Sequence, residues 1–236
     1  MRNKLLSAAL LIPCGASATT VVAVQTQTAV IISVDSKPTF HGGNGREILP
    51  STVSKLHQKG SVVFAIIGLD NDPNVGLYFR DVIADSFEEN DPFTTKISKA
   101  EKAVEEAIQT EIYLLKQRNK TELEHLLQEP YISGFFMADY SDSSPHLSVR
   151  TFKMELQPSP HLVAENCGGE NYICYSGPRD TWQKEVQKVF STTPDPLLAS
   201  RTIVENDIKS FPEKVGPPVV SVVVDMAGVH WISTPK

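Results

Sequence analysis

The sequence predicts an α+β protein in which two antiparallel sheets pack face to face between layers of helices. Apolar, β-branched runs occur in groups separated by groups of helical segments, in the order strands, two helices, strands, two helices, strands. A parallel α/β sheet would instead alternate strands and helices one by one. A four-layer αββα sandwich, with a helix pair outside each sheet, would bury every apolar face in this pattern.

Composition fits a globular chain with one core. The 236 residues are 41% hydrophobic and 21% charged, with a formal net charge of −6. Without a Lys/Arg-rich run, nucleic acid is not expected as a partner. After residue 18, no apolar run approaches the roughly 20 residues that span a bilayer. We therefore expect a single domain over residues 19–236 that does not enter a membrane.

The first 18 residues have the pattern of a secretory signal peptide. Arg2 and Lys4 are basic, 5–15 is apolar, and Ala16-Ser17-Ala18 is a small-x-small cleavage site. Cleavage after Ala18 would start the mature chain at Thr19 and predicts a secreted or periplasmic protein. A buried N-terminal helix is the alternative reading.

The first half of the mature chain predicts a strand group and a helix pair. A hairpin is expected first, then a Gly/Pro-rich loop, and then two strands that precede an amphipathic helix and a longer one. These segments are Thr20–Gln27, Ala29–Asp35, the loop 37–50, the strands near 52–56 and 61–68, and the helices 75–87 and 95–120.

The second half repeats this order. Two strands with a polar turn between them are followed by two helices and a terminal hairpin, whose turn contains Met226-Ala227-Gly228. These segments are the strands 131–141 and 146–156, the helices 181–190 and 196–211, and the strands 219–225 and 229–233.

Two cysteines remain after the predicted cleavage. Six residues separate Cys167 from Cys174, so a disulfide between them is expected in an oxidising compartment, with two separate thiols as the alternative. No CxxC or HExxH pattern occurs and the histidines are scattered. Neither a metal site nor a cofactor is expected.

The start of the predicted mature chain, TTVVAVQTQTAVIISVDS, resembles proteasome β-type subunits and the related bacterial threonine protease. These are N-terminal nucleophile (Ntn) hydrolases with an αββα sandwich. The family begins with its catalytic Thr and carries an Asp sixteen residues later, followed by Ser or Gly; Thr19, Asp35 and Ser36 match without a gap. The resemblance implies that Lys55 is the family's lysine, after a four-residue insertion, and that Gly68 is its oxyanion-hole glycine.

The resemblance is looser near the C-terminus. The segment YSGP places Ser176 at the family's accessory serine. Glu213 stands where the family has a second Asp, and Gly216 stands where it has a further Ser. These two departures affect the outer part of the predicted site.

The implied chemistry suits these residue types. A threonine hydroxyl is a weak nucleophile, and a free α-amino group on the same residue, with a reference pKa of roughly 7.7–8.0, can take its proton. The Lys55 ammonium would lower the pKa of that amine by like-charge repulsion, and Asp35 would hold Lys55. The Gly68 N–H would stabilise the oxyanion. Ser176 and Glu213 would adjust the amine and a nearby water.

Each residue also has an ordinary structural interpretation. Thr19 suits the start of a strand, Asp35 a strand end, and Lys55 a solvated surface. Gly68 suits a turn, and Ser176 and Glu213 suit structural or solvated positions. It is the combination of Thr19, Asp35 and Lys55 that favours a catalytic site.

The expected function is that of an exported threonine-type peptidase. By resemblance, Val53 and Ile66 line the substrate pocket, with His57 as a further candidate, which would favour an apolar side chain. Two alternatives stay open: an Ntn amidase or acylase that acts on a small amide, and a catalytically silent proteasome-like scaffold. The expected partner is therefore a peptide or small amide.

The family also implies an assembly. Its members work as stacked rings with an ATP-dependent unfolding partner, which is not expected for an exported protein. The long helix could pack between subunits of a homo-oligomer or against its own core, so the oligomeric state is left open.

Overall fold

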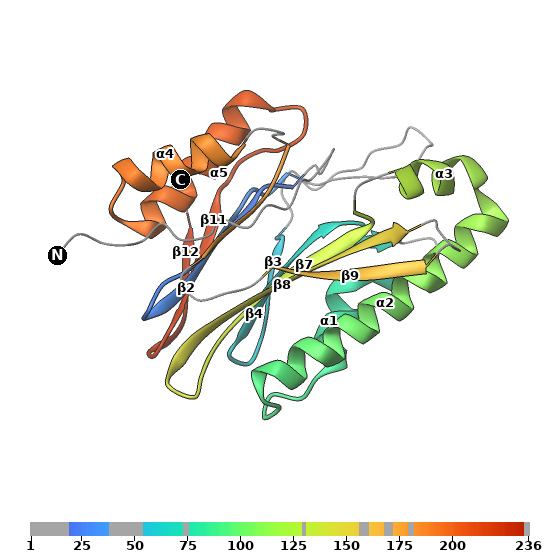
Figure 1. Cartoon of the computed structure of the whole chain (residues 1–236), viewed down its shortest axis with the longest axis horizontal. Helices are drawn as coiled ribbons and strands as arrows, with labels where there is room; N and C mark the ends of the chain where they lie inside the picture. The colour runs from blue at the N-terminus through green and yellow to red at the C-terminus, as the bar shows by residue number, and fades with distance from the viewer. Residues whose placement is uncertain are drawn as a thin grey trace.

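Two five-stranded antiparallel sheets face each other across a shared apolar core (Figure 1). The computed structural model describes residues 19–37, 54–72, 76–128, 131–155, 161–167, 172–178 and 182–233. The first sheet has the order β10 (Ile173–Ser176), β1 (Val21–Gln25), β2 (Ala29–Val34), β11 (Val220–Asp225), β12 (Gly228–Ser233). The second sheet has the order β3 (Leu56–Lys59), β4 (Val62–Gly68), β7 (Ser133–Ser141), β8 (Ser144–Glu155), β9 (His161–Cys167).

Helices cover the outer face of each sheet (Figure 1). The first sheet carries α4 (Trp182–Thr192) and α5 (Pro196–Ser210), and the second carries α1 (Phe79–Ser86) and α2 (Phe93–Arg118). A further helix, α3 (Lys120–Gln128), packs against α2, and a small two-stranded sheet of β5 (Asn71–Asp72) and β6 (Leu77–Tyr78) precedes α1. The layer order is helices, sheet, sheet, helices.

Strand alternation divides the first sheet's side chains between two cores. Val21 and Ala23 of β1 pack between the sheets, whereas Val22 and Val24 pack against the outer helices. This period of two follows from the pleat of a strand. Odd-numbered residues of β1 therefore face the second sheet, and even-numbered residues face α4 and α5.

The start and buried face of α5 follow from its sequence. Asp195 caps the helix by accepting hydrogen bonds from the Leu197 and Leu198 amides, and Pro196 occupies the first helical turn. The buried residues recur at helical spacing on the side that faces the sheet. They are Ala199, Ser200, Ile203, Val204 and Asp207.

The α+β class with two antiparallel sheets was predicted correctly, but several elements differ. The strand expected near 52–56 begins at Leu56 instead; residues 51–53 lie outside the described residues. The helix expected over 75–87 begins only at Phe79, after β6. The strands β9 and β10 and the helix α3 were not predicted.

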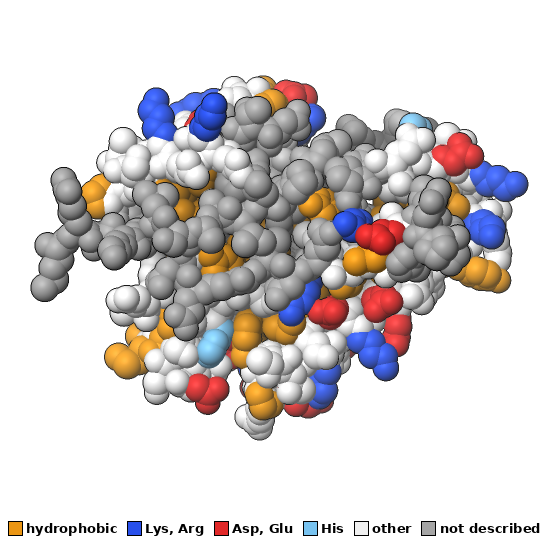
Figure 2. All heavy atoms as spheres, in the orientation of Figure 1, with side chains coloured by type: hydrophobic (Ala, Val, Ile, Leu, Met, Phe, Trp, Pro, Cys, Tyr) orange, Lys and Arg blue, Asp and Glu red, His pale blue; other side chains and the backbone are white. Residues whose placement is uncertain are grey.

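The described residues show neither a membrane-spanning helix nor a metal-binding cluster. None of their helices is long and apolar enough to cross a bilayer, and no three of their His, Cys, Asp or Glu side chains cluster as a metal site would require. On the face shown in Figure 2, acidic and basic side chains are interspersed over the side that carries α1–α3.

Candidate functional site

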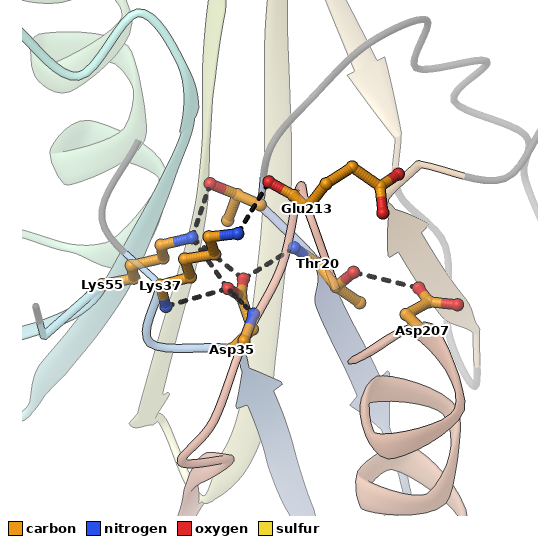
Figure 3. Close-up of polar contacts among 8 residues, drawn as sticks. Thr20, Asp35, Lys37, Lys55, Asp207 and Glu213 are labelled. Atoms are coloured by element: carbon orange, nitrogen blue, oxygen red, sulfur yellow. Dashed lines mark hydrogen bonds and ion pairs between the residues drawn. The ribbon is translucent and has the colours of Figure 1, made fainter. Parts of the chain in front are cut away.

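Three chain segments bring Thr19, Asp35 and Lys55 together. Thr19 lies two residues before β1, Asp35 follows β2, and Lys55 precedes β3 of the opposite sheet. The Lys55 Nζ donates hydrogen bonds to Thr19 Oγ1 at 3.1 Å and to Asp35 Oδ1 and Oδ2 at 2.9 and 3.0 Å (Figure 3). All three side chains are buried. The trio that the resemblance implied is thus one hydrogen-bonded cluster that bridges the two sheets.

The β1–β2 hairpin explains why two of these residues are neighbours. Its antiparallel register pairs Val21 with Val34, so the residues just before β1 and just after β2 lie side by side. The Asp35 amide donates to the Thr20 carbonyl at 3.2 Å, and the Thr20 amide donates to Asp35 Oδ1 at 2.9 Å. Hairpin pairing therefore fixes Asp35 beside the start of β1.

The Asp35 carboxylate is surrounded by donors. Besides Lys55, it accepts hydrogen bonds from the backbone amides of Thr20, Lys37 and Gly216, at 2.9, 3.0 and 3.2 Å. Such bonds stabilise a buried carboxylate and fix its orientation. Asp35 is therefore a rigid acceptor for the Lys55 ammonium.

Gly216, which stands where the resembling family has a serine, has two local roles. Its carbonyl accepts from the Ser36 amide at 2.9 Å, and its own amide donates to Asp35. A Cβ at this position would lie 3.2 Å from the Lys37 Cβ. The absent side chain leaves room for Lys37, whose Nζ donates to the Pro212 carbonyl at 2.6 Å. The same Nζ donates to the Glu213 carbonyl at 2.7 Å (Figure 3).

Burial lowers the pKa of the Lys55 ammonium below that of an ordinary lysine, although the attraction of Asp35 opposes the shift. The carboxylate of Asp70 also acts to raise this pKa. A buried ammonium of lowered pKa, hydrogen-bonded to a hydroxyl oxygen, donates strongly and exchanges its proton more readily than a solvated lysine. The electrostatics of the cluster therefore suit an activated Thr19 hydroxyl.

Gly68 and Ser176 lie at strand ends. Gly68 ends β4 with a φ of +73°, and a Cβ there would come within 2.7 Å of the Ile132 carbonyl oxygen, so the position requires glycine. Ser176 ends β10 opposite Val21 and is fully buried, which places it beside the start of β1. The oxyanion role of Gly68 and the accessory role of Ser176 stay predictions.

The structure does not bring the Glu213 carboxylate to the trio. Glu213 lies in the loop between α5 and β11, with an exposed side chain that points away from Asp35 and Lys55 (Figure 3). Its contact with the site is the backbone carbonyl that accepts from Lys37. A carboxyl group that is buried nearby belongs to Asp207 of α5 instead.

The predicted pocket residues are only partly described. Val53 lies outside the described residues. Ile66 packs in the core between the second sheet and α1–α2 and is 6% exposed, which leaves little of it for a substrate. The His57 ring lies 5.4 Å from that of Phe64, and burial lowers the pKa of His57 to about 4.

The predicted disulfide is not resolved by the structure. Cys174 is buried in β10 within the core between the sheets. The backbone of Cys167 ends β9 in the second sheet, and its side chain lies outside the described residues.

Sequence reasoning missed the residues that hold Thr20. The Thr20 hydroxyl donates to Asp207 Oδ2 at 2.9 Å (Figure 3), and the Tyr175 hydroxyl donates to the same oxygen at 2.7 Å. A signal was present in the sequence: Asp207 continues the helical spacing of Ser200 and Ile203, so it falls on the buried stripe of α5.

No model of a known protein family matches the sequence, and a search of curated proteins finds no significant match.

Proposed function

We propose that this protein is an exported hydrolase with an N-terminal threonine nucleophile, acting on peptide bonds. The observation that carries the proposal is the contact of Lys55 Nζ with both Thr19 Oγ1 and the Asp35 carboxylate. The layer order and the antiparallel sheets are compatible with the Ntn hydrolase fold. Export rests on the sequence pattern of residues 1–18, whose removal would leave Thr19 with a free amine.

The first half of the reaction forms an ester. The Thr19 α-amine takes the hydroxyl proton as Oγ1 attacks the substrate carbonyl carbon, and the Lys55 ammonium stabilises the charge that develops on Oγ1. The tetrahedral intermediate then collapses. Its C–N bond breaks, the protonated α-amine gives the proton to the leaving amine, and the acyl group remains on Thr19.

The second half restores the enzyme. Water attacks the ester carbonyl while the α-amine takes a proton from it. The C–O bond to Thr19 breaks, the proton returns to Oγ1, and the carboxylic acid product leaves. Throughout both halves, Asp35 keeps Lys55 directed at Oγ1.

The test uses the mature protein, with its N-terminus established by mass spectrometry, a peptide library and a panel of small amides. We expect peptide hydrolysis that is lost in Thr19→Ala and in a chain that retains Ala18, because an amide nitrogen cannot act as the base. Cleavage of small amides alone would reassign the substrate class to an amidase. A folded, correctly trimmed chain that cleaves neither would overturn the proposal in favour of a silent scaffold.

A further inference from the structure

A buried carboxyl group lies on the opposite side of the first sheet from Lys55. Asp207 in the last turn of α5 is fully buried, and its Oδ2 accepts hydrogen bonds from the hydroxyls of Thr20 and Tyr175. Thr20 lies just before β1, Tyr175 lies in β10, and Asp207 lies in α5. The mechanism above uses none of their side chains.

The backbone at Gly177 passes very close to this cluster. A Cβ on Gly177 would lie 2.3 Å from the Tyr175 hydroxyl oxygen and 3.0 Å from Asp207 Oδ2. A side chain at position 177 would therefore have to displace the Tyr175 hydroxyl from its hydrogen bond to Asp207. The cluster is therefore closely packed as well as hydrogen-bonded.

Thr20 is held at two points. Its amide donates to Asp35 at 2.9 Å and its hydroxyl donates to Asp207 at 2.9 Å. Since successive residues of an extended chain face opposite ways, Thr20 is directed at the outer helices while Thr19 is directed at Lys55. The orientation of Thr19 thus depends on how firmly Thr20 is held.

This dependence matters most in a chain that begins at Thr19. The first residues of a domain are poorly ordered unless they are tied down, and such a Thr19 would have only one peptide bond, the one to Thr20. A nucleophile must be held close to its attack geometry, and a shift of about 1 Å can cost roughly 100-fold in rate.

We propose that Thr20, Tyr175 and Asp207 form a positioning cluster that fixes the direction of the Thr19 hydroxyl and amine. The proposal rests on the proposed function, because it concerns the reactivity of Thr19. Within it, Asp207 acts through Thr20 and does not touch the substrate.

A second tie between α5 and the first sheet provides a matched control. The Ser33 Oγ of β2 lies 2.8 Å from the Oγ atoms of both Ser200 in α5 and Ser221 in β11. This serine cluster is also buried and joins the same helix to the same sheet. It contains no residue adjacent to Thr19. Its loss should therefore weaken the packing of α5 on the sheet without changing the orientation of Thr19.

The experiment measures the rate at which an N-terminal-threonine-directed electrophile labels Thr19 in Thr20→Val, Thr20→Ser and Ser33→Ala. Each mature N-terminus is verified by mass, and rates are expressed per folded molecule. For Thr20→Val we expect a fall of roughly 10- to 100-fold in the maximal labelling rate, with the half-saturating probe concentration nearly unchanged. Thr20→Ser, which keeps the hydroxyl, should restore most of the rate. Ser33→Ala should lose stability but label at the wild-type rate.

Equal labelling of Thr20→Val and wild type, or an equal loss in Ser33→Ala, would overturn the positioning role. Hydrogen exchange of the residue-20 amide separates this failure from failure of the proposed function. That amide should exchange faster in Thr20→Val than in wild type or Ser33→Ala, whether or not the protein is an enzyme. Unchanged exchange would contradict the cluster's anchoring role, whereas absent labelling in wild type with the exchange difference intact would contradict the proposed function alone.

Discussion

Two buried lysine–aspartate pairs in this molecule have nearly the same geometry. Lys55 Nζ lies 2.9 Å from Asp35 Oδ1, and Lys96 Nζ lies 3.0 Å from Asp139 Oδ2. Every side chain in the two pairs is less than a tenth exposed. The two pairs differ in the other groups that the lysine side chain contacts.

Lys55 also donates to the Thr19 hydroxyl, and burial lowers its pKa. Lys96 joins α2 to β7, and among the described residues its Nζ donates a hydrogen bond to Asp139 alone. Asp139 also accepts hydrogen bonds from the Ser61 hydroxyl and the Tyr140 amide. An ion pair of the same form thus serves a reactive hydroxyl in one place and holds a helix on a sheet in the other.

The largest expected effect comes from removing the lysine at the site. Lys55→Met should lower the rate of Thr19 labelling and of peptide hydrolysis by roughly 10²- to 10³-fold, the usual loss when one donor that stabilises charge developing in the transition state is removed. Its stability is measured alongside by denaturant unfolding, so that rates refer to folded protein. If folded Lys55→Met keeps the wild-type rates, the Lys55–Asp35 pair has no role in the reactivity of Thr19.

The equivalent change in the other pair should act on stability. Lys96→Met leaves Asp139 buried without a counter-ion, which should lower the free energy of unfolding by about 3–5 kcal/mol. The rate of Thr19 labelling per folded molecule should be unchanged. Adding Asp139→Leu should recover most of that loss, because a buried pair replaced by apolar side chains is often neutral. The comparison fails if Lys96→Met loses Thr19 labelling as fully as Lys55→Met does.

A histidine outside both pairs should contribute to the acid sensitivity of the fold. His57 has a pKa of about 4 in the folded protein, lowered by burial and by Arg80, against 6.5 unfolded. As the pH falls from 6.5 to 4, His57 becomes protonated in the unfolded chain but stays largely neutral in the folded one. The free energy of unfolding should therefore fall by roughly 3 kcal/mol. Unfolding at pH 7 and pH 4.5 should show a smaller acid loss in His57→Gln than in wild type. Equal losses would mean that another group is responsible.

The smallest effect is expected for a cation beside the site that does not touch Thr19. Lys37→Met removes two hydrogen bonds to the loop between α5 and β11, which should cost about 1 kcal/mol because that side chain is partly solvated. Labelling should fall far less than in Lys55→Met. A loss as large as that of Lys55→Met would show that positive charge near Asp35, and not contact with Thr19, governs reactivity.

The pairing of Thr19 with Asp35 could be predicted because a hairpin is a local structure. Two β-branched runs separated by a short turn almost dictate their own register, and the register places the first residue beside the one after the second strand. The place of Lys55 could not be predicted from local structure, because this residue precedes a strand of the opposite sheet. Its assignment depended on the resemblance and on a gap that no local pattern fixes.

The errors have a common physical origin. β10 is four residues long and β9 carries polar residues, so their strand character depends on neighbours that are distant in sequence. Likewise ENDIK, in the second half of α5, looks like a solvated helical surface until the helix is docked, when Asp207 proves to face Thr20. Glu213 was assigned from its distance to Ser176 along the chain, and a sequence distance carries no information on which side chain is buried.

The most direct test of the account is to map the site of covalent modification by an N-terminal-threonine-directed electrophile on the mature wild-type chain. We expect one adduct per chain, on Thr19, with no other residue modified. A folded chain that begins at Thr19 and remains unmodified, or carries the adduct elsewhere, would contradict the claim that Lys55 and Asp35 activate this threonine.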